Sequence, residues 1–525
     1  MAVTSAGGEP RSLAEIALLR LARDPSAPFL LTIDEDEPHE VTTRTYGEVG
    51  ARILAVAEAL RVAGVQPGDT IGCYLANTPC WVVGSFGGWW AGAAIGAVGT
   101  LLPGPEATRL FEMAGIRVVV ALEGHDLPGR FEVIEVDEEG ELVGRPPAVP
   151  LTGAPDVALP DPDSLAAIFF TSGTTGQPKG ISYTHEDCVV AGQRIATGYA
   201  NNTAYRPGSA PAHLSPGVVF NAFGHTAGFV RLAFRMWIGR ATLLIPKFTV
   251  PAIAAYVERF KPDSLQLQPA TIHMLATADQ DIDLSSVTYV TSSTAPLSNA
   301  TRDLFEQRYG APVLQAYGMT EVGTVSQERL EDVQAGRRGL GSVGRPARGV
   351  ELKIRTLADE DRPDGEGEIL VRTKAMPAEF VGGSKVPVDD EGWFSTGDIG
   401  RYEDGILYIT GRAQEKIIVG GFNVYPAEVE DALKRSPLVR DALLVGVPDD
   451  RLGERPVAGI VWAGEPDEAK VLEGLRAVLA PYKLPRQTFA LDALPLTPRD
   501  KVDRKRARAL ALEAIGSEED RCPTR

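Results

Sequence analysis

A ten-residue loop between two apolar segments constrains this chain of 525 residues more than any other feature. The loop, Thr171–Gly180, carries four hydroxyl side chains, three glycines and one lysine. The apolar runs Leu165–Phe170 and Ile181–Tyr183 on either side predict two strands. Glycines let backbone N–H groups face one point, and the hydroxyls and the lysine add donors, which suits a polyphosphate. The loop is not a Walker A loop, because Pro178 replaces its second glycine and Gly180 follows the lysine where Ser or Thr is required.

This loop alone does not distinguish a phosphate site from a polar hairpin, so the rest of the chain has to decide. The length predicts two or more domains. The 70 acidic and 52 basic residues give a net charge of −18, which disfavours binding to nucleic acid or an anionic membrane. Four cysteines without metal-ligand spacing, and an N-terminus without the apolar core of a secretion signal, predict free thiols and a cytoplasmic protein.

The segment Trp81–Leu102 is almost wholly apolar and long enough to cross a bilayer. It contains six glycines, and no cluster of basic residues beside it marks a cytoplasmic end. We therefore expect a buried helix that runs into a buried strand, and no membrane span.

Helical and strand patterns alternate along the chain. Thr45–Ala63 has apolar residues at helical spacing and ends before Gly64, and Thr70–Leu75 reads as a strand. Further strands are expected at 118–121, 241–245, 264–267 and 287–290. This alternation predicts an α/β fold of layered helices and sheets.

Several later segments contain side chains that are suited to binding or catalysis. Gln315–Glu321 (QAYGMTE) combines an aromatic ring, a glycine, a hydroxyl and a carboxylate, which suit a base, a close backbone approach, a phosphate and Mg²⁺ in turn. Asn221–Gly228 (NAFGHTAG) and the turn Ser292–Leu297 precede it, and Ser395–Asp398 follows it. Asp398 is suited to accept hydrogen bonds from ribose hydroxyls.

With Thr171–Gly180, these segments resemble motifs of the adenylate-forming superfamily, which includes acyl-CoA synthetases, peptide-synthetase adenylation domains and beetle luciferases. The hinge-like Gly411–Lys416, the glycine pair in Gly420–Glu430 and the closing Leu494–Arg504 also resemble family motifs. The resemblance runs in order from about Thr45 to Arg506. It implies a large N-terminal adenylation core, 1–412, and a small mobile α/β C-terminal domain, 413–525.

The resemblance also implies the site residues. Those for ATP and AMP are Thr171, Ser172, Gly173, Thr174, Thr175, Gly176, Lys179, Thr294, Ala295, Pro296, Ala316, Tyr317, Gly318, Met319, Thr320, Asp398, Arg412 and Lys501. Those for the acyl pocket are His225, Thr226, Ser293, Thr294, Ala316 and Gly318. Those for catalysis are Lys501, Thr320, Glu321 and His225, with Glu321 holding Mg²⁺. Gly420, Gly421 and Phe422 are implied for CoA and Gln414 for the hinge.

Some departures from the family pattern bear on the substrate, and others lie at the hinge and in the closing motif. Thr226 stands where amino-acid-activating relatives place an aspartate for the substrate ammonium, so we expect a plain carboxylic acid. Ser293 and Thr294 replace glycines of the family turn, and they either narrow or polarise the pocket. Gln414 replaces the usual Asp or Lys at the hinge, and Asp500 precedes Lys501 in place of a glycine.

The implied activity is that of an acid–thiol ligase. It uses ATP and Mg²⁺ to convert a small carboxylic acid to acyl-AMP and then forms a thioester with CoA. The nearest alternative is a ligase that loads the pantetheine of an acyl carrier protein. Two others are a luciferase-like oxygenase that uses only the adenylate and a catalytically silent binding protein on the same fold. The combination of Lys501, Glu321, Asp398 and Arg412 argues against the silent protein.

Overall fold

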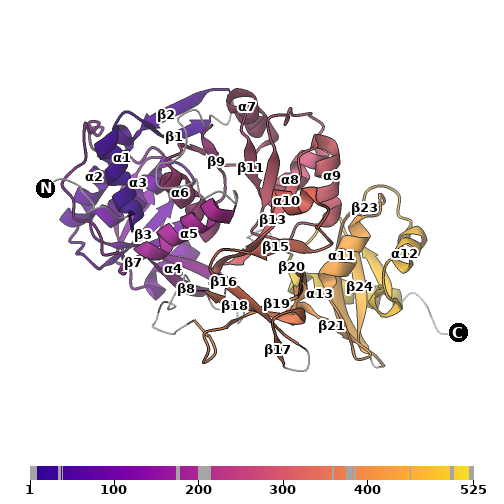
Figure 1. Cartoon of the computed structure of the whole chain (residues 1–525). Coiled ribbons are helices and arrows are strands. Elements are labelled where there is room, and N and C mark those ends of the chain that lie inside the picture. Colours follow the sequence, from indigo (N-terminus) through magenta and orange to yellow (C-terminus); the bar gives the residue numbers. More distant parts are fainter. Residues whose placement is uncertain are drawn as a thin grey trace.

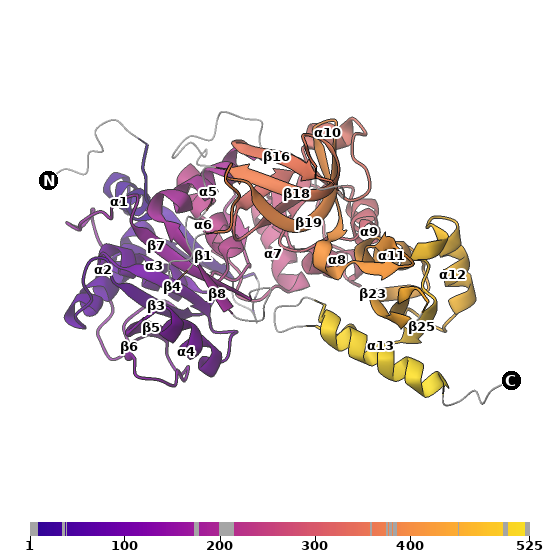
Figure 2. The same ribbon diagram turned by 90° about the horizontal axis from the view of Figure 1, so that it is seen from below.

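The computed structural model describes residues 9–33, 37, 39–172, 178–198, 215–356, 360–373, 376, 381, 386–449, 451–496 and 502–519. These residues form four sheets, called A to D here, with helices packed against them. The N-terminal elements lie at one end of the molecule and the C-terminal elements at the other, in both views (Figures 1 and 2).

Sheet A holds the strands around the glycine-rich loop. Its order is β6-β5-β3-β4-β7-β8, all pairs being parallel except antiparallel β7 and β8. The strands are β3 (Thr70–Leu75), β4 (Ala94–Gly99), β5 (Val118–Leu122), β6 (Glu132–Val136), β7 (Leu165–Ser172) and β8 (Pro178–Thr184). The loop therefore joins two strands, as the sequence predicts.

Helices cover both faces of sheet A. One face packs in the core formed with α1 (Leu13–Arg23), α2 (Tyr46–Val62), α3 (Pro79–Trp90), α5 (His185–Gly198) and α6 (Thr226–Ile238). The opposite face packs on α4 (Gly104–Met113). Thr45 caps α2 in a reciprocal pair with Glu48, so the helix begins where the sequence predicts.

Sheet B lies on the far side of these helices. Its order is β2-β1-β10-β9, with strands β1 (Pro28–Ile33), β2 (Val41–Thr45), β9 (Gly217–Val219) and β10 (Thr242–Leu244). A second core joins sheet B to the start of sheet C, and it includes residues of α7 (Val250–Phe260), α8 (Pro269–Thr277) and α9 (Asn299–Tyr309).

Sheet C is long and changes character along its length. Its order is β11-β12-β13-β14-β15-β20-β19-β18-β16-β17, parallel from β11 to β13 and antiparallel thereafter. The strands are β11 (Ser264–Leu267), β12 (Tyr289–Ser292), β13 (Val313–Met319), β14 (Gly323–Gln327), β15 (Ser342–Pro346), β16 (Val350–Arg355), β17 (Asp361–Arg362), β18 (Gly365–Thr373), β19 (Phe394–Glu403) and β20 (Ile406–Arg412). The short helix α10 (Leu330–Gln334) lies between β14 and β15 in the chain.

Sheet D forms the small C-terminal part, coloured orange to yellow in Figure 1. Its order is β22-β21-β24-β23, with β25 beside β24. The strands are β21 (Ile417–Val419), β22 (Phe422–Val424), β23 (Val439–Asp449), β24 (Gly453–Trp462) and β25 (Gln487–Ala490). The helices are α11 (Pro426–Lys434), α12 (Glu468–Arg476) and α13 (Arg504–Glu519), and this part has its own apolar core.

Most predicted elements are confirmed, and one strand begins later than expected. The strand expected at 287–290 begins two residues later, as β12, because Val287 and Thr288 still belong to the loop after α8. The glycine-rich segments 341–346 and 365–369 are largely strands β15 and β18 of the long sheet C.

Helix α3 and strand β4 account for the apolar segment Trp81–Leu102. No helix in the described ranges has the length and hydropathy needed to span a bilayer. The glycines of α3 allow close packing on both sides: a Cβ atom on Gly87 would lie 2.6 Å from Val56 Cγ1 of α2, and one on Gly88 would lie 2.9 Å from Ile71 Cδ1 of β3. The glycines therefore allow α3 to pack closely against helix α2 on one side and against sheet A on the other.

We predict that Gly87→Ala destabilises the protein by roughly 1–3 kcal/mol, because the added methyl overfills the contact between α2 and α3. Thermal unfolding monitored by circular dichroism measures the change. Gly474→Ala is the matched control, since Gly474 also lies in a helix, α12, but a Cβ there has no neighbour within 4 Å. The control should be neutral or slightly stabilising. Equal melting temperatures for the two variants would contradict the packing argument.

Candidate functional site

Two predicted motifs meet at the carboxyl ends of neighbouring strands. β12 and β13 are parallel, and their register places Ser292 opposite Gln315. The turn Ser293–Pro296 follows β12, and β13 ends with Tyr317, Gly318 and Met319. The Ser293–Pro296 turn is called the acyl turn here, because Ser293 and Thr294 are among the residues predicted for the acyl pocket. It and the QAYGMTE segment therefore emerge at the same edge of sheet C, although about twenty residues separate them.

The turn after β12 is open on one side and anchored on the other. Thr294, Ala295 and Pro296 are exposed, whereas Ser293 is half-buried. Thr294 has φ +81°, in the left-handed region that β-branched residues rarely adopt. The Ser293 hydroxyl lies 3.1 Å from Nη2 of the buried Arg231, which donates to it. A polar contact from α6 therefore holds the start of this turn.

A tyrosine connects sheet A to the end of β13. Tyr183 lies in β8, the strand that leaves the glycine-rich loop, and its hydroxyl donates to the Thr320 carbonyl at 2.6 Å. Burial raises the pKa of Tyr183 well above its usual value, so this hydroxyl keeps its proton. Residues 173–177 of the loop lie outside the described residues, but Lys179 pairs with Thr171 across β7 and β8. The bond places Thr320 beside the strand that carries Lys179.

A chain of three side chains runs from β13 to the end of β20. The Tyr317 hydroxyl donates to Asp398 Oδ2 at 2.6 Å, and Arg412 Nε lies 2.9 Å from Asp398 Oδ1. Asp398 is buried and Arg412 is exposed. Burial, followed by the Asp398 charge, raises the pKa of Tyr317. The cluster brings together an aromatic ring, a carboxylate and a guanidinium, which can contact a base, a ribose and a phosphate.

The segment Asn221–Gly228 lies at the carboxyl end of β4. The Phe223 N–H donates to Asn77 Oδ1 at 3.1 Å, and a Cβ on Gly224 would lie 2.6 Å from the Gly99 nitrogen. His225 is the exposed N-cap residue of α6, and Thr226 begins the helix. Arg231, farther along α6, links this segment to the Ser293 turn, so the two parts of the expected acyl pocket are joined.

The structure gives a reason for glycine at position 318 that the sequence does not reveal. A Cβ atom there would meet the Gly323 carbonyl oxygen of the facing strand β14. Ala316, implied for the nucleotide site and the acyl pocket, is half-buried in β13. The glycine is therefore required by the hairpin itself, whatever approaches its open side.

The glycine pair expected for CoA forms a turn. Gly420 and Gly421, with φ +58° and +89°, connect β21 to β22, and a Cβ on Gly421 would have no neighbour within 4 Å. Phe422 follows them, 56% exposed and stacked on Tyr482 with ring centroids 4.6 Å apart. The turn is thus open, and its backbone geometry favours glycine at both positions.

A short turn connects the C-terminal part to the rest of the protein, and its helix α11 contacts α9 and β20. Gln414 is exposed in the 3-10 turn Ala413–Glu415, which connects β20 to β21. Asp431 of α11 accepts from the Asn299 backbone N–H at 2.7 Å and from its Nδ2 at 3.0 Å, at the start of α9. Lys501 lies outside the described residues, and Leu496 and Val502 form a bridge on either side of that stretch.

Comparison with known proteins identifies the family. Residues 20–378 match the profile of the AMP-binding enzyme family, and residues 428–501 match that of the AMP-binding enzyme C-terminal domain. This chain belongs to the AMP-binding enzyme family. These enzymes form the adenylate-forming superfamily that the motifs predict, so this prediction is confirmed.

Two curated relatives match nearly the whole of this chain. The chain is 28% identical over 510 residues to sulfoacetate–CoA ligase of Cupriavidus necator, and the match covers 94% of this chain and 96% of that protein. It is 31% identical to a Mycobacterium tuberculosis CoA ligase for 3-[(3aS,4S,7aS)-7a-methyl-1,5-dioxo-octahydro-1H-inden-4-yl]propanoate, covering 89% and 94%.

The structure of an anthranilate CoA ligase bound to anthranoyl-AMP superposes with a TM-score of 0.81 at 24% identity. It covers 98% of this chain and 100% of that one, which confirms the expected fold. Since the relatives are CoA ligases, this AMP-binding enzyme is an acid–thiol ligase that uses ATP to form acyl-AMP and CoA to form the thioester.

Sequence reasoning missed three of the contacts that organise the site. Tyr183 acts through one hydrogen bond and Asp431 through two, all between segments far apart in the sequence, and no local pattern signals such bonds. Arg231 had a signal: it and Arg235 lie one turn apart in an otherwise apolar helix. Two charged side chains on a buried helical face need polar partners elsewhere in the fold.

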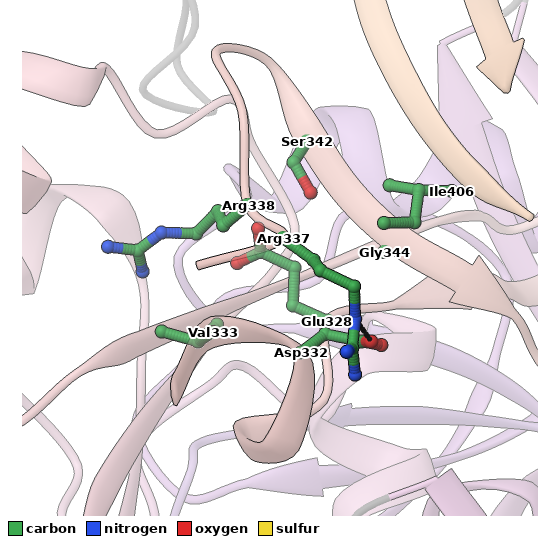
Figure 3. Close-up of a pocket in the computed structure, with 8 residues that line it drawn as sticks. All are labelled: Glu328, Asp332, Val333, Arg337, Arg338, Ser342, Gly344 and Ile406. Atoms are coloured by element: carbon green, nitrogen blue, oxygen red, sulfur yellow. Dashed lines mark hydrogen bonds and ion pairs between the residues drawn. The ribbon is translucent and has the colours of Figure 1, made fainter. Parts of the chain in front are cut away.

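Glu328 and Asp332 lie among the residues that line a small pocket (Figure 3), and Glu328 also holds β13 in position. Glu328 brackets Gln315, because its Oε2 accepts from the Gln315 N–H at 2.9 Å and its N–H donates to the Gln315 carbonyl at 2.8 Å. Asp332 lies nearby and pairs with Arg337 and Arg345. Burial raises the pKa of Glu328, more than its hydrogen bond from Gln315 lowers it. We assign this pocket to support of β13.

Because the pKa of Glu328 is raised, the direction in which its contribution to stability changes with pH can be predicted. The protonated carboxyl contributes fully below the unfolded-state pKa, and this contribution is lost as pH rises through the folded-state pKa. We predict that the melting temperature of Glu328→Gln, relative to the parent protein, increases between about pH 4 and pH 8, because glutamine stays neutral.

Glu351→Gln is the control for this measurement. Its hydrogen bond from Arg372 lowers the pKa of Glu351, so the stability it supplies is present at high pH and is lost as pH falls. The relative melting temperature of Glu351→Gln should therefore change with pH in the opposite direction. Parallel pH profiles for the two variants would disprove the assignment.

Proposed function

We propose that the residues at the edge of sheet C divide the two half-reactions of this ligase between the large and the small domain. The observation that carries the proposal is the meeting of the Ser293–Pro296 turn, the Tyr317–Glu321 segment and the Asp398–Arg412 pair around the ends of β12, β13 and β20. Adenylate and acyl group would occupy this edge.

The first half-reaction joins two anions. A carboxylate oxygen of the acid attacks the α-phosphorus of ATP, the bond to pyrophosphate breaks, and acyl-AMP forms. The attacking group is already ionised, so no general base is needed, and catalysis is positioning and charge stabilisation. Lys501 would lie between the carboxylate and the α-phosphate. Residues Thr171–Gly176 and Lys179 would hold the leaving pyrophosphate.

The adenosine part would lie against the residues of β13 and β19. The Tyr317 ring is held by its bond to Asp398, which leaves a ring face for adenine, and the rest of Ala316–Met319 would line the same side. The second carboxylate oxygen of Asp398 also pairs with Arg412, so ribose hydroxyls would share this oxygen with the guanidinium. Thr320 would donate its hydroxyl to the α-phosphate, while its carbonyl is already bound by Tyr183.

Glu321 fits a Mg²⁺ ion. Its carboxylate is half-buried and, within the described ranges, makes no hydrogen bond or ion pair, which leaves its oxygens free to coordinate. Mg²⁺ usually binds through one or two carboxylates together with substrate phosphates. When bound, the ion would neutralise charge on the phosphates, and Glu321 would fix its position beside Thr320.

The acid is expected to lack an α-amino group. Thr226 at the start of α6 supplies no charge for an ammonium, and His225, Ser293 and Thr294 would line the rest of the pocket. The two curated relatives described above act on acids as different as sulfoacetate and a bicyclic propanoate, so relatedness alone does not specify the acid.

The second half-reaction would require the C-terminal domain to turn. The proposed domains are 1–412 and 413–525, with Gln414 in the exposed turn between β20 and β21 as the hinge. Rotation would remove Lys501 and bring the open turn of Gly420, Gly421 and Phe422 to the adenylate. The CoA thiol then attacks the acyl carbonyl, and AMP leaves. The Asp431 bonds to Asn299 would hold one of the two orientations.

CoA is favoured over a carrier protein as the acceptor because the full-length relatives act on CoA. A carrier protein is the alternative acceptor, and the ligase relatives disfavour a luciferase-like oxygenase and a silent protein. A cytoplasmic site of action also belongs to the proposal. Light emission with a luciferin would identify the oxygenase, and ATP binding without pyrophosphate release would identify the silent protein.

A panel of acids tests the proposed function. We predict that plain carboxylic acids drive pyrophosphate release with ATP and Mg²⁺, and that addition of CoA gives acyl-CoA and AMP, measured by mass spectrometry. A phosphopantetheinylated carrier protein in a parallel arm tests the other acceptor. The proposal is wrong if only α-amino acids drive the reaction, or if the thioester forms on the carrier and not on CoA.

Separate assays of the half-reactions test the division of labour. We predict that Lys501→Ala slows acyl-AMP formation by roughly 10²–10³-fold, because one electrostatic group between two anions is lost, and leaves thioester formation from synthetic acyl-AMP near the parent rate. Gly421→Leu should show the reverse pattern, because a side chain at φ +89° is strained and obstructs the thiol. Equal damage to both half-reactions in Lys501→Ala would show that the lysine is structural.

A further inference from the structure

We propose that Tyr183 and Arg194 are positioning residues for magnesium binding, because they hold the turn that carries its proposed ligand, Glu321. The inference rests on the proposed function and adds to it two residues that lie outside the motifs described above. Each acts indirectly, through a backbone carbonyl beside Glu321. Together they keep the carboxylate in a fixed position relative to the phosphates of ATP.

Glu321 lies in the turn that connects β13 to β14. Met319 and Gly323 are paired across the two strands, and the Val322 N–H donates to the Met319 carbonyl at 3.2 Å. Thr320 and Glu321 therefore occupy the middle of the turn. Connecting segments are more mobile than the strands they join, whereas Mg²⁺ requires near-ideal octahedral geometry. A carboxylate on such a turn needs support from other parts of the fold to bind the ion well.

Tyr183 holds the peptide group that precedes Glu321. Its hydroxyl donates to the Thr320 carbonyl at 2.6 Å. A peptide group is planar, so holding this carbonyl also holds the nitrogen and Cα of Glu321. The tyrosine ring is buried and packs edge-on against Phe169 of β7, with ring centroids 5.6 Å apart. Burial is the main cause of the raised pKa of Tyr183, and nearby negative charges, including that of Glu321, add to it.

Arg194 holds the other side of the turn. It lies in α5, which packs against β14, and its Nη1 donates to the Val322 carbonyl at 3.4 Å. A Cβ atom on Gly323 would lie 3.6 Å from the same Nη1. The Arg194 Nη2 donates to the hydroxyl of Thr373 at the end of β18, which joins the turn to a distant strand of sheet C. The residues before and after Glu321 thus each have their carbonyl bound by a side chain.

The same two residues connect the turn to the glycine-rich loop. Tyr183 lies in β8, the strand that leaves the loop and contains Lys179. Helix α5 follows β8 directly, and Thr184 caps it in a reciprocal pair with Asp187. The loop and Glu321 are proposed to act on the phosphates of one ATP molecule. The bonds from β8 and α5 therefore set the position of the metal ligand relative to the loop.

Tyr256 provides a comparison for a purely structural role. It is buried like Tyr183, its hydroxyl also donates to a backbone carbonyl, that of Pro216 at 2.8 Å, and burial raises its pKa to about 12. It lies in α7, which carries no residue proposed for the site. The two bonds are chemically alike and differ in what the accepting carbonyl supports. If both bonds only stabilise the fold, losing either hydroxyl should have the same consequences.

The test measures magnesium binding without turnover. Titration calorimetry with no acid present gives the dissociation constant of ATP with Mg²⁺ and with EDTA, and the ratio of the two is the magnesium enhancement. Tyr183→Phe should reduce this enhancement by about tenfold, the lower end of the loss seen when a group that orients a metal ligand is removed. Tyr256→Phe should leave the enhancement unchanged, although both variants lose one hydrogen bond and should melt at similarly lowered temperatures.

Further variants separate positioning from other effects. Arg194→Met should also reduce the enhancement, and Arg194→Lys, which keeps a charged donor, should recover part of it. These variants carry the test if Tyr183→Phe does not fold. In a protein that already contains Glu321→Gln, adding Tyr183→Phe should cause no further loss of the enhancement, because the ligand that the tyrosine positions is gone.

The outcomes distinguish the inference from the function on which it rests. If Glu321→Gln keeps the enhancement of the parent protein, the proposed magnesium site itself is wrong. If Glu321→Gln loses the enhancement while Tyr183→Phe and Arg194→Met keep it, only the positioning role is disproved. The same conclusion follows if Tyr256→Phe loses as much as Tyr183→Phe, or if Tyr183→Phe causes its full loss in the Glu321→Gln protein.

Discussion

The parallel pairing of β12 with β13 is the interaction on which the site depends. The register of this pair places Ser292 opposite Gln315. The acyl turn and the Tyr317–Glu321 segment then leave the same edge of sheet C. Glu328 holds Gln315 from behind through both of its backbone hydrogen-bonding groups, and this keeps the end of β13 in place.

Three side-chain contacts connect this edge to other parts of the protein. Tyr183 joins it to sheet A, Arg231 joins it to α6, and Asp398 joins it to the strand that leads into the C-terminal part. A single hydrogen bond contributes only about 1 kcal/mol to stability. Its larger effect here is to orient groups that rigid strands and helices already place within reach.

The net charge of the chain is negative, whereas arginine side chains lie near the edge of sheet C. The chain carries a net charge of −18, whereas ATP and the acid substrate are both anions. Arg412 at the edge of sheet C and Arg231 beneath the Ser293–Pro296 turn place guanidinium groups beside the residues that are proposed for the site. A local positive charge against an acidic background is what lets such a protein gather two anions that repel each other.

Local patterns in the sequence determined much of the protein. Helix α2 begins at its capping box and β3 spans the residues that its apolar run predicts, because both depend on neighbours in the chain. The motifs were sufficient to predict the family and the layered α/β fold. Their roles in the site, including that of Lys501, stay predictions.

Tertiary structure decided what no local pattern contains. Gly318 is required by the carbonyl of Gly323 across a hairpin, and Gly87 by Val56 on another helix. Ser293 reads as an ambiguous substitution until Arg231, 62 residues away in the chain, is found beside it. The physical reason is common to all three: contacts between segments distant in sequence form only when packing brings them together, and the residues near each one in the chain carry no trace of its partner.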